Sequence, residues 1–169
     1  GQLPRFAATP AELAATTDHA KKAVAASRAA FGAWSTTPAS QRAGVLFKAA
    51  AILRRRRFEL AAWEVYECGK PWRESDADIA EAIDFCEFYA QAARRLLPPH
   101  ALGHLLGEQN TLWYEPRGVA AVISPWNFPV SICLGMTAAA LVTGNAVLVK
   151  PAEQTPYCGQ LVCETLWQA

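Results

Sequence analysis

Apolar residues recur at helical spacing through the first hundred residues of the chain. Near the start, Thr9-Pro10-Ala11-Glu12 combines a capping Thr, a Pro at the first helical position and a Glu three residues after the cap. This combination is typical of the beginning of a helix. We expect a helix that runs from there to about Trp34.

A long run rich in Ala, Leu and Arg follows the first predicted helix. Thr37 and Pro38 repeat the cap-plus-proline signal before the run, and the sequence Gly69-Lys70-Pro71 stops it after Cys68. We predict that this span holds two helices, separated by a break near Arg57.

A third helical region has a single apolar face. Ser75 with Asp78 opens the region, and two prolines at positions 98 and 99 end it. Spacings of three and four residues predict one amphipathic helix. The apolar residues that recur on its face are Ile79, Ala82, Ile83, Cys86, Ala90, Ala93 and Leu97.

The pattern changes after a loop that contains Gly and His. Residues 111–114 are predicted to form a strand, and Val119–Ile123 a second strand that is apolar on both faces. The chain therefore passes from a helical segment, residues 1–100, to an alternating α/β segment, residues 110–169.

Strand and helix alternate in the second segment. A helix from Pro129 through Val142, capped by Gly144 and Asn145, leads to a buried strand over residues 146–149. A final helix begins at residues 155–156. Two strands joined by a helix must be parallel, with a right-handed crossover. The predicted fold class is α/β, with N-terminal helices followed by the start of a parallel, Rossmann-like sheet.

Composition and charge exclude several classes of protein. The 169 residues are 52% hydrophobic and 18% charged, which is typical of a globular chain with its own core. A net charge of +1 creates no field that favours nucleic acid or an anionic membrane. The uncharged residues 118–149 are numerous enough to cross a bilayer, but Pro125, Pro129 and Gly144 divide them. We therefore expect no membrane span, and the N-terminus lacks the apolar core of a signal peptide.

Cysteine, histidine and arginine patterns give no metal or phosphate site. The five cysteines form no C-x-x-C pair, which favours a reducing, cytoplasmic setting without a disulfide framework. His100 and His104 are four residues apart, but neighbouring Pro and Gly residues disfavour the helix that metal ligation at this spacing needs. We expect loop histidines and no metal. The arginines at positions 54–57 are interpreted as a solvated helix end.

Two loops follow the predicted parallel strands, at residues 124–129 and 150–156. Ligands of parallel sheets bind beyond the carboxyl ends of the strands, so both loops are expected at one edge. In the first loop, Asn127 can donate a hydrogen bond to an oxygen that gains negative charge, or only satisfy its own turn. In the second, Lys150 and Glu153 can bind the vicinal hydroxyls of a ribose or form a solvated ion pair.

These two loops resemble those of the aldehyde dehydrogenase superfamily. The run Ile123-Ser124-Pro125-Trp126-Asn127-Phe128-Pro129 is followed at family-like spacing by residues 143–145 and 150–156. The resemblance covers residues 10–169 and is most specific from Glu115 onward. It implies the leading, cofactor-facing part of an enzyme that uses NAD and a small-molecule aldehyde, with a homo-oligomer as the assembly of the parent protein.

The resemblance also implies roles for individual residues. Asn127 matches the residue that helps to hold the thiohemiacetal oxyanion, and Lys150 and Glu153 match residues that contact the adenosine ribose. A carboxylate at Glu153 generally accompanies NAD because it repels a 2′-phosphate. No G-x-G-x-x-G follows a strand, but this family binds NAD without that fingerprint. Family positions that line the cofactor cleft match Ile123, Ser124, Pro125, Trp126 and Ala152.

The substrate class comes from the third helix. Residues 76–90 resemble a segment of 1-pyrroline-5-carboxylate dehydrogenases, including those fused to proline dehydrogenase. Glu81 matches a Glu that approaches the amino-acid end of the substrate and can pair with its α-ammonium, or it can be a solvated helical Glu. Phe128 can pack on the aliphatic part of the substrate or belong to the core. The expected reaction is the oxidation of L-glutamate γ-semialdehyde to glutamate in proline catabolism.

The family mechanism also needs a cysteine thiolate that attacks the aldehyde and a glutamate base that activates water. We find neither family motif in the chain, so we expect it to be inactive by itself. It should also expose an unpaired, apolar sheet edge. Two alternatives stay open. The first is another aldehyde dehydrogenase, such as one for succinate semialdehyde, and the second is a non-catalytic binding or assembly module.

Overall fold

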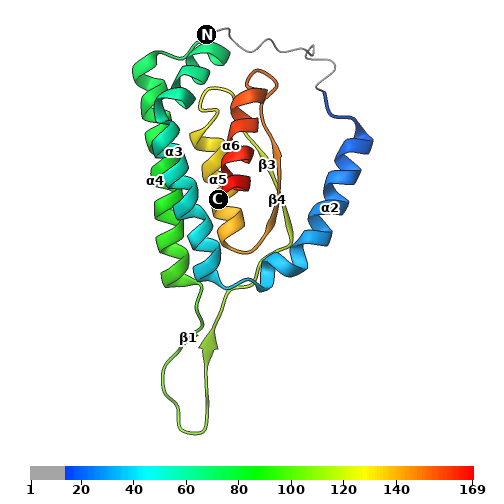
Figure 1. Cartoon of the computed structure of the whole chain (residues 1–169). Coiled ribbons are helices and arrows are strands. Elements are labelled where there is room, and N and C mark those ends of the chain that lie inside the picture. Colours follow the sequence, from blue (N-terminus) through cyan, green and yellow to red (C-terminus); the bar gives the residue numbers. More distant parts are fainter. Residues whose placement is uncertain (1–13) are drawn as a thin grey trace.

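Helices precede a strand–helix–strand–helix unit in this chain (Figure 1). The structure is a computed structural model and describes residues 14–169. Its elements are α2 (Thr17–Thr36), α3 (Ala39–Cys68), α4 (Trp72–Leu96), β1 (His100–Ala101), β2 (Thr111–Leu112), β3 (Val119–Ile123), α5 (Ser131–Val142), β4 (Ala146–Lys150) and α6 (Pro156–Gln168). The predicted α/β fold class is confirmed.

Helix α2 ends close to the predicted position. It runs to Thr36, two residues beyond the expected Trp34. Thr16 caps its start, because the Thr16 hydroxyl accepts a hydrogen bond from the backbone N–H of His19 at 3.2 Å. The predicted helix start at Thr9-Pro10-Ala11-Glu12 lies outside the described residues.

Helices α3 and α4 form a long antiparallel pair, and α3 is a single helix of 30 residues. The predicted break near Arg57 is therefore wrong. The Arg57 guanidinium donates two hydrogen bonds to Asp76 on α4, at 2.5 and 2.7 Å, and Leu53 and Leu60 on either side are buried. Contacts with α4 thus hold α3 straight where the local sequence suggested an interruption.

The turn between α3 and α4 follows the predicted stop signal. Gly69 ends α3 in the left-handed conformation, with φ of 67°, which a residue with a side chain rarely adopts. Helix α4 begins at Trp72, earlier than the predicted Ser75, so Ser75 and Asp78 lie inside the helix and are buried. The predicted apolar face is confirmed, since six of its seven residues are buried and Leu97 packs against the core.

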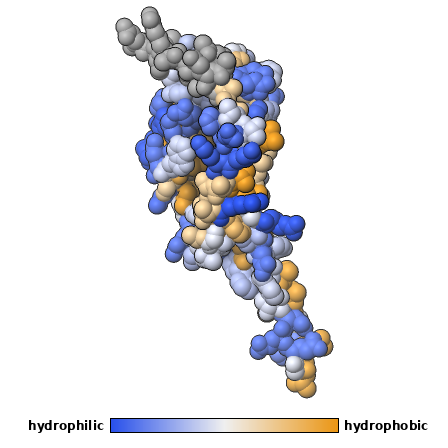
Figure 2. Space-filling view, turned by 90° about the vertical axis from the view of Figure 1, so that its right-hand side faces the viewer, coloured by the Kyte–Doolittle hydropathy of each residue, from blue (hydrophilic) through white to orange (hydrophobic). Residues whose placement is uncertain are grey.

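A β-hairpin follows α4 where a loop was predicted. β1 pairs antiparallel with β2, with His100 opposite Leu112. The predicted strand over residues 111–114 is shorter than expected, because β1 offers only two residues for pairing and such a partner cannot be recognised locally. The hairpin extends away from the helices (Figure 1), and apolar surface lies at its far end (Figure 2). Leu105 and Leu106, in the loop between β1 and β2, are exposed.

The second segment has the predicted parallel pairing. β3 and β4 pair from Val119 opposite Ala146 to Ile123 opposite Lys150, and α5 connects them. Helix α2 packs against this sheet from one side and α5 from the other (Figure 1). Within residues 14–169 the sheet has two strands, so the strands are less buried than predicted, and Ile123 is 69% exposed.

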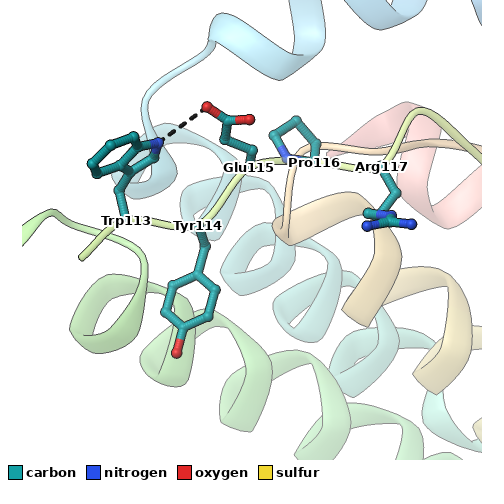
Figure 3. Close-up of a pocket in the computed structure, with 5 residues that line it drawn as sticks. All are labelled: Trp113, Tyr114, Glu115, Pro116 and Arg117. Carbon is teal, nitrogen blue, oxygen red and sulfur yellow. Dashed lines mark hydrogen bonds between the residues drawn. The ribbon is translucent and has the colours of Figure 1, made fainter.

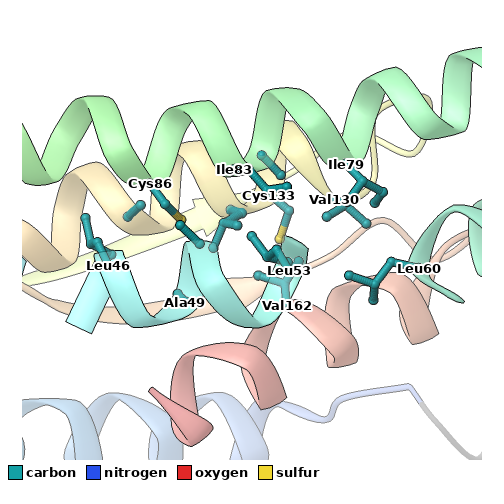
Figure 4. Packing of buried hydrophobic residues seen from close by; sticks show 14 of the residues in the cluster. Leu46, Ala49, Leu53, Leu60, Ile79, Ile83, Cys86, Val130, Cys133 and Val162 are labelled. Atoms are coloured by element: carbon teal, nitrogen blue, oxygen red, sulfur yellow. The ribbon is translucent and has the colours of Figure 1, made fainter. Parts of the chain in front are cut away.

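The hydrophobic core joins α3, α4, α5 and α6 (Figure 4). Leu53 of α3, Ile83 of α4, Cys133 of α5 and Val162 of α6 meet in it. The packed helices thereby fix the end of the sheet from which the two loops depart. Among the described residues, no helix has both the length and the apolar character that a membrane crossing requires.

Candidate functional site

The two predicted loops leave the same end of the sheet. Ile123 pairs with Lys150 at the last position of the parallel ladder. One residue further, the backbone N–H of Ser124 donates to the carbonyl oxygen of Lys150 at 3.2 Å. The expectation that Asn127 and Lys150 lie at one edge is therefore confirmed.

The first loop, residues 124–129, carries an exposed side-chain amide, that of Asn127, between two buried ends. Asn127 is exposed, and its side chain makes no hydrogen bond with any other residue of the described chain. Its amide thus does not satisfy the turn, which was the alternative interpretation. Ser124 and Pro129 at the two ends of the loop are buried, whereas Trp126 is 50% exposed. The backbone is held while the amide is available to a ligand.

A cluster of three buried charged residues lies behind this loop. Lys70 Nζ lies 3.8 Å from Glu64 Oε2 and 3.7 Å from Asp78 Oδ2, and none of the three side chains is more than 6% exposed. We call Glu64, Lys70 and Asp78 the buried charge cluster. Lys70 Nζ also lies 3.7 Å from the centroid of the Phe128 ring, and Asp78 Oδ2 accepts a hydrogen bond from the backbone N–H of Val130 at 3.4 Å.

The electrostatics of the cluster are asymmetric. Burial, and next to it the neighbouring Asp78, raise the pKa of Glu64 to about 10, and the opposing effect of Lys70 is smaller. Glu64 is therefore neutral near pH 7. A neutral Glu64 leaves one cation, Lys70, beside one anion, Asp78, so the buried cluster carries no net charge.

The second loop, residues 150–156, carries an exposed ion pair. Lys150 Nζ lies 3.3 Å from Glu153 Oε2, and the two side chains are 61% and 78% exposed. A backbone hydrogen bond, and after it Lys150, lower the pKa of Glu153, so its carboxyl group is ionised. Ala152 between them is buried. This geometry agrees with the solvated pair and equally leaves both side chains accessible to a sugar.

The start of α6 fixes the far end of the second loop. Glu67, in the last turn of α3, accepts hydrogen bonds from the backbone N–H groups of Tyr157 and Cys158, both at 2.8 Å. The carboxylate thus occupies the positive end of α6, where backbone donors have no partner within the helix. A Cβ on Gly159 would lie 2.4 Å from Pro151 Cβ, so the loop also packs closely on the helix.

Glu81 stays apart from the polar network of the two loops. It lies on α4 and is exposed, and the described chain contains no hydrogen bond or ion pair that joins it to either loop. Phe128 is 38% exposed and rests on Lys70, so it is not a core residue. The substrate roles of both residues stay predictions.

The buried charge cluster and the role of Glu67 were not predicted from the sequence. A signal for the cluster existed: Glu64 follows Leu60 by four residues, and Asp78 precedes Ala82 by four, so both charges fall on apolar helix faces. Charged residues at such positions need a partner. The partner of Glu67, in contrast, lies about ninety positions away, and no local pattern indicates it.

The arginine run lies in the middle of α3, so the expected helix end is wrong. Arg54 pairs with Glu87 on α4 at 2.7 Å, and Arg57 pairs with Asp76 on the same helix. The run therefore joins two helices. As for the histidines, His104 lies in the hairpin loop as expected, whereas His100 belongs to β1.

The five cysteines all lie in helices and are buried or half-buried. Burial raises the pKa of every one of these thiols, to about 12 for Cys86 and about 11 for Cys163. A raised pKa keeps a thiol protonated and poorly nucleophilic. Among the described residues, no cysteine has the environment of an activated nucleophile.

Residues 113–117 line a shallow pocket (Figure 3). Trp113 Nε1 donates to Glu115 Oε1 at 3.0 Å, and Arg117 lies two residues before the first residue of β3, Val119. The pocket is therefore at the amino end of the sheet. Ligands of parallel sheets bind at the opposite, carboxyl end, so this pocket is not part of the candidate site.

A parallel strand–helix–strand unit with polar loops at its carboxyl edge is typical of α/β folds, in which that edge is the usual place for ligands. Residues 8–169 match the model of the aldehyde dehydrogenase family. The chain belongs to the aldehyde dehydrogenase family.

Curated relatives bear the name 1-pyrroline-5-carboxylate dehydrogenase. The protein of Geobacillus thermodenitrificans (strain NG80-2) is 51% identical over 150 residues, which cover 89% of this chain and 29% of the relative. That of Bacillus subtilis (strain 168) is 47% identical over 150 residues, again 89% of this chain and 29% of the relative. This chain thus spans less than a third of the length of these relatives.

Solved structures give the same family. The 1-pyrroline-5-carboxylate dehydrogenase from Thermus with bound NAD is 44% identical, with a TM-score of 0.87 over 91% of this chain and 30% of that chain. Proline utilization A from Bdellovibrio bacteriovorus, inactivated by N-propargylglycine, is 46% identical, with a TM-score of 0.89 over 91% of this chain and 16% of that chain. The predicted resemblance is confirmed.

Proposed function

We propose that this chain is part of an NAD-dependent 1-pyrroline-5-carboxylate dehydrogenase that oxidises L-glutamate γ-semialdehyde to glutamate. The observation that carries the proposal is the shared sheet edge. There an unpaired Asn127 amide lies on the same side as the exposed Lys150 and Glu153. The names of the relatives and of the solved structures support the substrate class.

In this proposal Asn127 stabilises developing charge. When a nucleophile adds to the aldehyde carbon, the carbonyl oxygen becomes an oxyanion, and the Asn127 amide donates a hydrogen bond to it. The donor is effective because the loop that carries it has buried ends and needs little reorganisation. The nucleophilic cysteine and the glutamate base come from residues beyond this chain, which is inactive alone.

Residues 1–169 form part of the NAD-binding domain in this proposal, with the helical segment at 1–100 and the parallel unit at 110–169. Lys150 and Glu153 hold the adenosine ribose, and bound NAD supplies the hydride acceptor. The wall of the cofactor cleft consists of Ile123, Ser124, Pro125, Trp126 and Ala152. A cytoplasmic location and a homo-oligomeric parent protein stay predictions.

Substrate choice is tested in the complete polypeptide that contains this chain. Oxidation of L-glutamate γ-semialdehyde and of succinate semialdehyde is followed by NAD reduction in wild type and Glu81→Gln. Loss of a charge-assisted hydrogen bond to the α-ammonium lowers kcat/KM about 10-fold for the amino-acid aldehyde alone. Glu87→Gln, on the same helix, is the matched control. Equal losses on both substrates would assign Glu81 no role in selection, and a preference for succinate semialdehyde would refute the proposed substrate.

The module alternative is tested with the 169-residue chain. Calorimetric titration with NAD shows whether it binds cofactor, and sizing shows whether it self-associates. If the complete polypeptide oxidises no aldehyde with NAD while this chain assembles with a partner, the enzyme proposal is wrong.

A further inference from the structure

We infer that Lys70, supported by Asp78 and Glu64, is a positioning residue that holds the loop carrying Asn127 in place. The catalytic part of this inference rests on the proposed function. The structural part does not, because it concerns only the order of residues 124–130.

Fixed points lie on both sides of Asn127. On one side, the N–H of Ser124 donates to Lys150 and continues the parallel ladder. On the other side, the next residue, Phe128, stacks over the Lys70 ammonium at 3.7 Å. An ammonium that close to a ring and removed from water is attracted to the face of the ring. The exposed Asn127 is thus the free member of a segment that is held before and after it.

A second contact from the same cluster reaches the loop. Asp78 Oδ2 lies 3.7 Å from Lys70 Nζ and accepts the backbone N–H of Val130 at 3.4 Å. Asp78 therefore connects the cation under Phe128 to the backbone two residues further on. A shift of Lys70 would disturb the Phe128 ring and the Val130 hydrogen bond together.

The buried charge cluster is not expected to add much to the free energy of unfolding. A buried ion pair loses its hydration, and replacing such a pair with apolar residues is often neutral or stabilising. In this cluster Lys70 Nζ is buried and has no hydrogen-bond partner within the described residues. What the cluster does provide is a directed contact to one loop, which an apolar replacement would not reproduce.

The three members differ in what they contribute. The high pKa of Glu64 makes it neutral, so Gln is its isosteric substitute. Asp78 carries the charge that balances Lys70 and accepts from Val130. The inference therefore ranks the substitutions: Lys70→Met and Asp78→Asn loosen the loop, and Glu64→Gln affects it less.

The chain offers a matched control on the same two helices. Arg54 of α3 pairs with Glu87 of α4 at 2.7 Å, and these side chains are 56% and 37% exposed. This pair also joins the helices, but within residues 14–169 no hydrogen bond or ion pair connects either residue to the first loop, residues 124–129, which we call the Asn127 loop. Glu87→Gln weakens an interhelical ion pair and leaves the loop unchanged.

Hydrogen exchange and steady-state kinetics on the complete polypeptide test the inference. In Lys70→Met, amide exchange in residues 124–132 accelerates about 10-fold, which corresponds to about 1.4 kcal/mol. With the aldehyde it oxidises fastest, kcat falls about 10-fold while KM for NAD is unchanged. Asp78→Asn behaves alike, and Glu87→Gln matches wild type in both measurements.

Phe128→Leu covers the case in which Lys70→Met does not fold. It removes the ring and leaves the buried charges, and the same acceleration of exchange is expected. Wild-type exchange in residues 124–132 of either variant would overturn the inference, as would equal changes in Glu87→Gln. Failure of the proposed function is distinguishable, because a protein that oxidises another aldehyde, or none, still reports loop order by exchange.

Discussion

The two loops at the sheet edge are held in opposite ways. The Asn127 loop has buried ends, and a buried, net-neutral set of charges supports it from behind. In the second loop the charges of Lys150 and Glu153 are themselves exposed, and the loop is fixed through the backbone of α6 by Glu67. A donor that stabilises a transition state must be preorganised. Groups that bind a sugar can stay solvated until the ligand arrives, so the difference matches the proposed division of labour.

The residues that hold the two loops, Glu67 and Lys70, both lie at the end of α3. Glu67 lies in the last turn of α3, and Lys70 lies in the turn that follows. Glu67 reaches the second loop and Lys70 the first. Substitutions at the end of α3 can therefore separate the two loops experimentally, because each affects one loop and spares the other.

The largest effect is expected from a substitution at Asn127, in the first loop. Asn127→Ala removes the proposed oxyanion donor and should lower kcat of the complete polypeptide about 100-fold, with KM for NAD unchanged. Asn110→Ala, which removes an exposed amide from the hairpin, is the control. Turnover within a few-fold of wild type in Asn127→Ala would remove the central role of the first loop.

Glu67→Ala should act on the second loop. It leaves the N–H groups of Tyr157 and Cys158 without their carboxylate, so the free energy of unfolding should fall by about 2 kcal/mol. Denaturant unfolding measures this loss, and Glu67→Gln, which keeps an acceptor, should lose less. Glu164→Ala, which removes the side-chain hydrogen bond between Gln160 and Glu164 on α6, is the control. If KM for NAD stays at its wild-type value in Glu67→Ala, the proposed support of the ribose-binding loop is wrong.

Lys150→Ala should separate binding from stability. Because the ion pair with Glu153 is exposed, its loss should change the free energy of unfolding by less than about 0.5 kcal/mol. If Lys150 holds the ribose, KM for NAD should rise about 10-fold with kcat nearly unchanged. A kcat effect as large as that of Asn127→Ala would show that the two loops do not divide their roles.

The last expected effect is a pH dependence of stability. Glu64 has a pKa near 4.5 in the unfolded chain and about 10 in the fold, so between these values the folded state binds the extra proton. The free energy of unfolding therefore falls as pH rises, by about 1.4 kcal/mol for each pH unit between pH 6 and pH 8. Glu64→Gln should lack this contribution while Lys70, Asp78 and Cys68 still surround the site. Thermal melts at several pH values measure the melting temperature of both proteins. If the melting temperature depends on pH equally in wild type and Glu64→Gln, Glu64 is ionised in the fold.

Local patterns predicted the elements that depend on local signals. The apolar face of α4 follows from its spacing, and the turn at Gly69 from its backbone freedom. The loop at Asn127 was located because strand and helix punctuation surround it. These features need only neighbouring residues, so one sequence suffices for them.

Features that depend on distant partners were missed. The continuity of α3 at Arg57 depends on Asp76 of the next helix, and β1 exists because residues 111–112 return to it. The contact of Lys70 with Phe128 joins positions that only the packed fold brings together. Sequence could locate the loops, but not what supports them.

The uninterrupted α3 also sets the distance between two contacts at opposite ends of the sheet. Near its start, Arg42 donates to the carbonyl oxygen of Val142 at 2.9 Å, and in its last turn Glu67 reaches α6. Its 30 residues span about 45 Å, at a rise of about 1.5 Å per residue. One residue inserted near Arg57 would rotate everything beyond it by about 100°. Glu67 and Lys70 would then both face away from their loops, so the length of α3 is under the same constraint as the site itself.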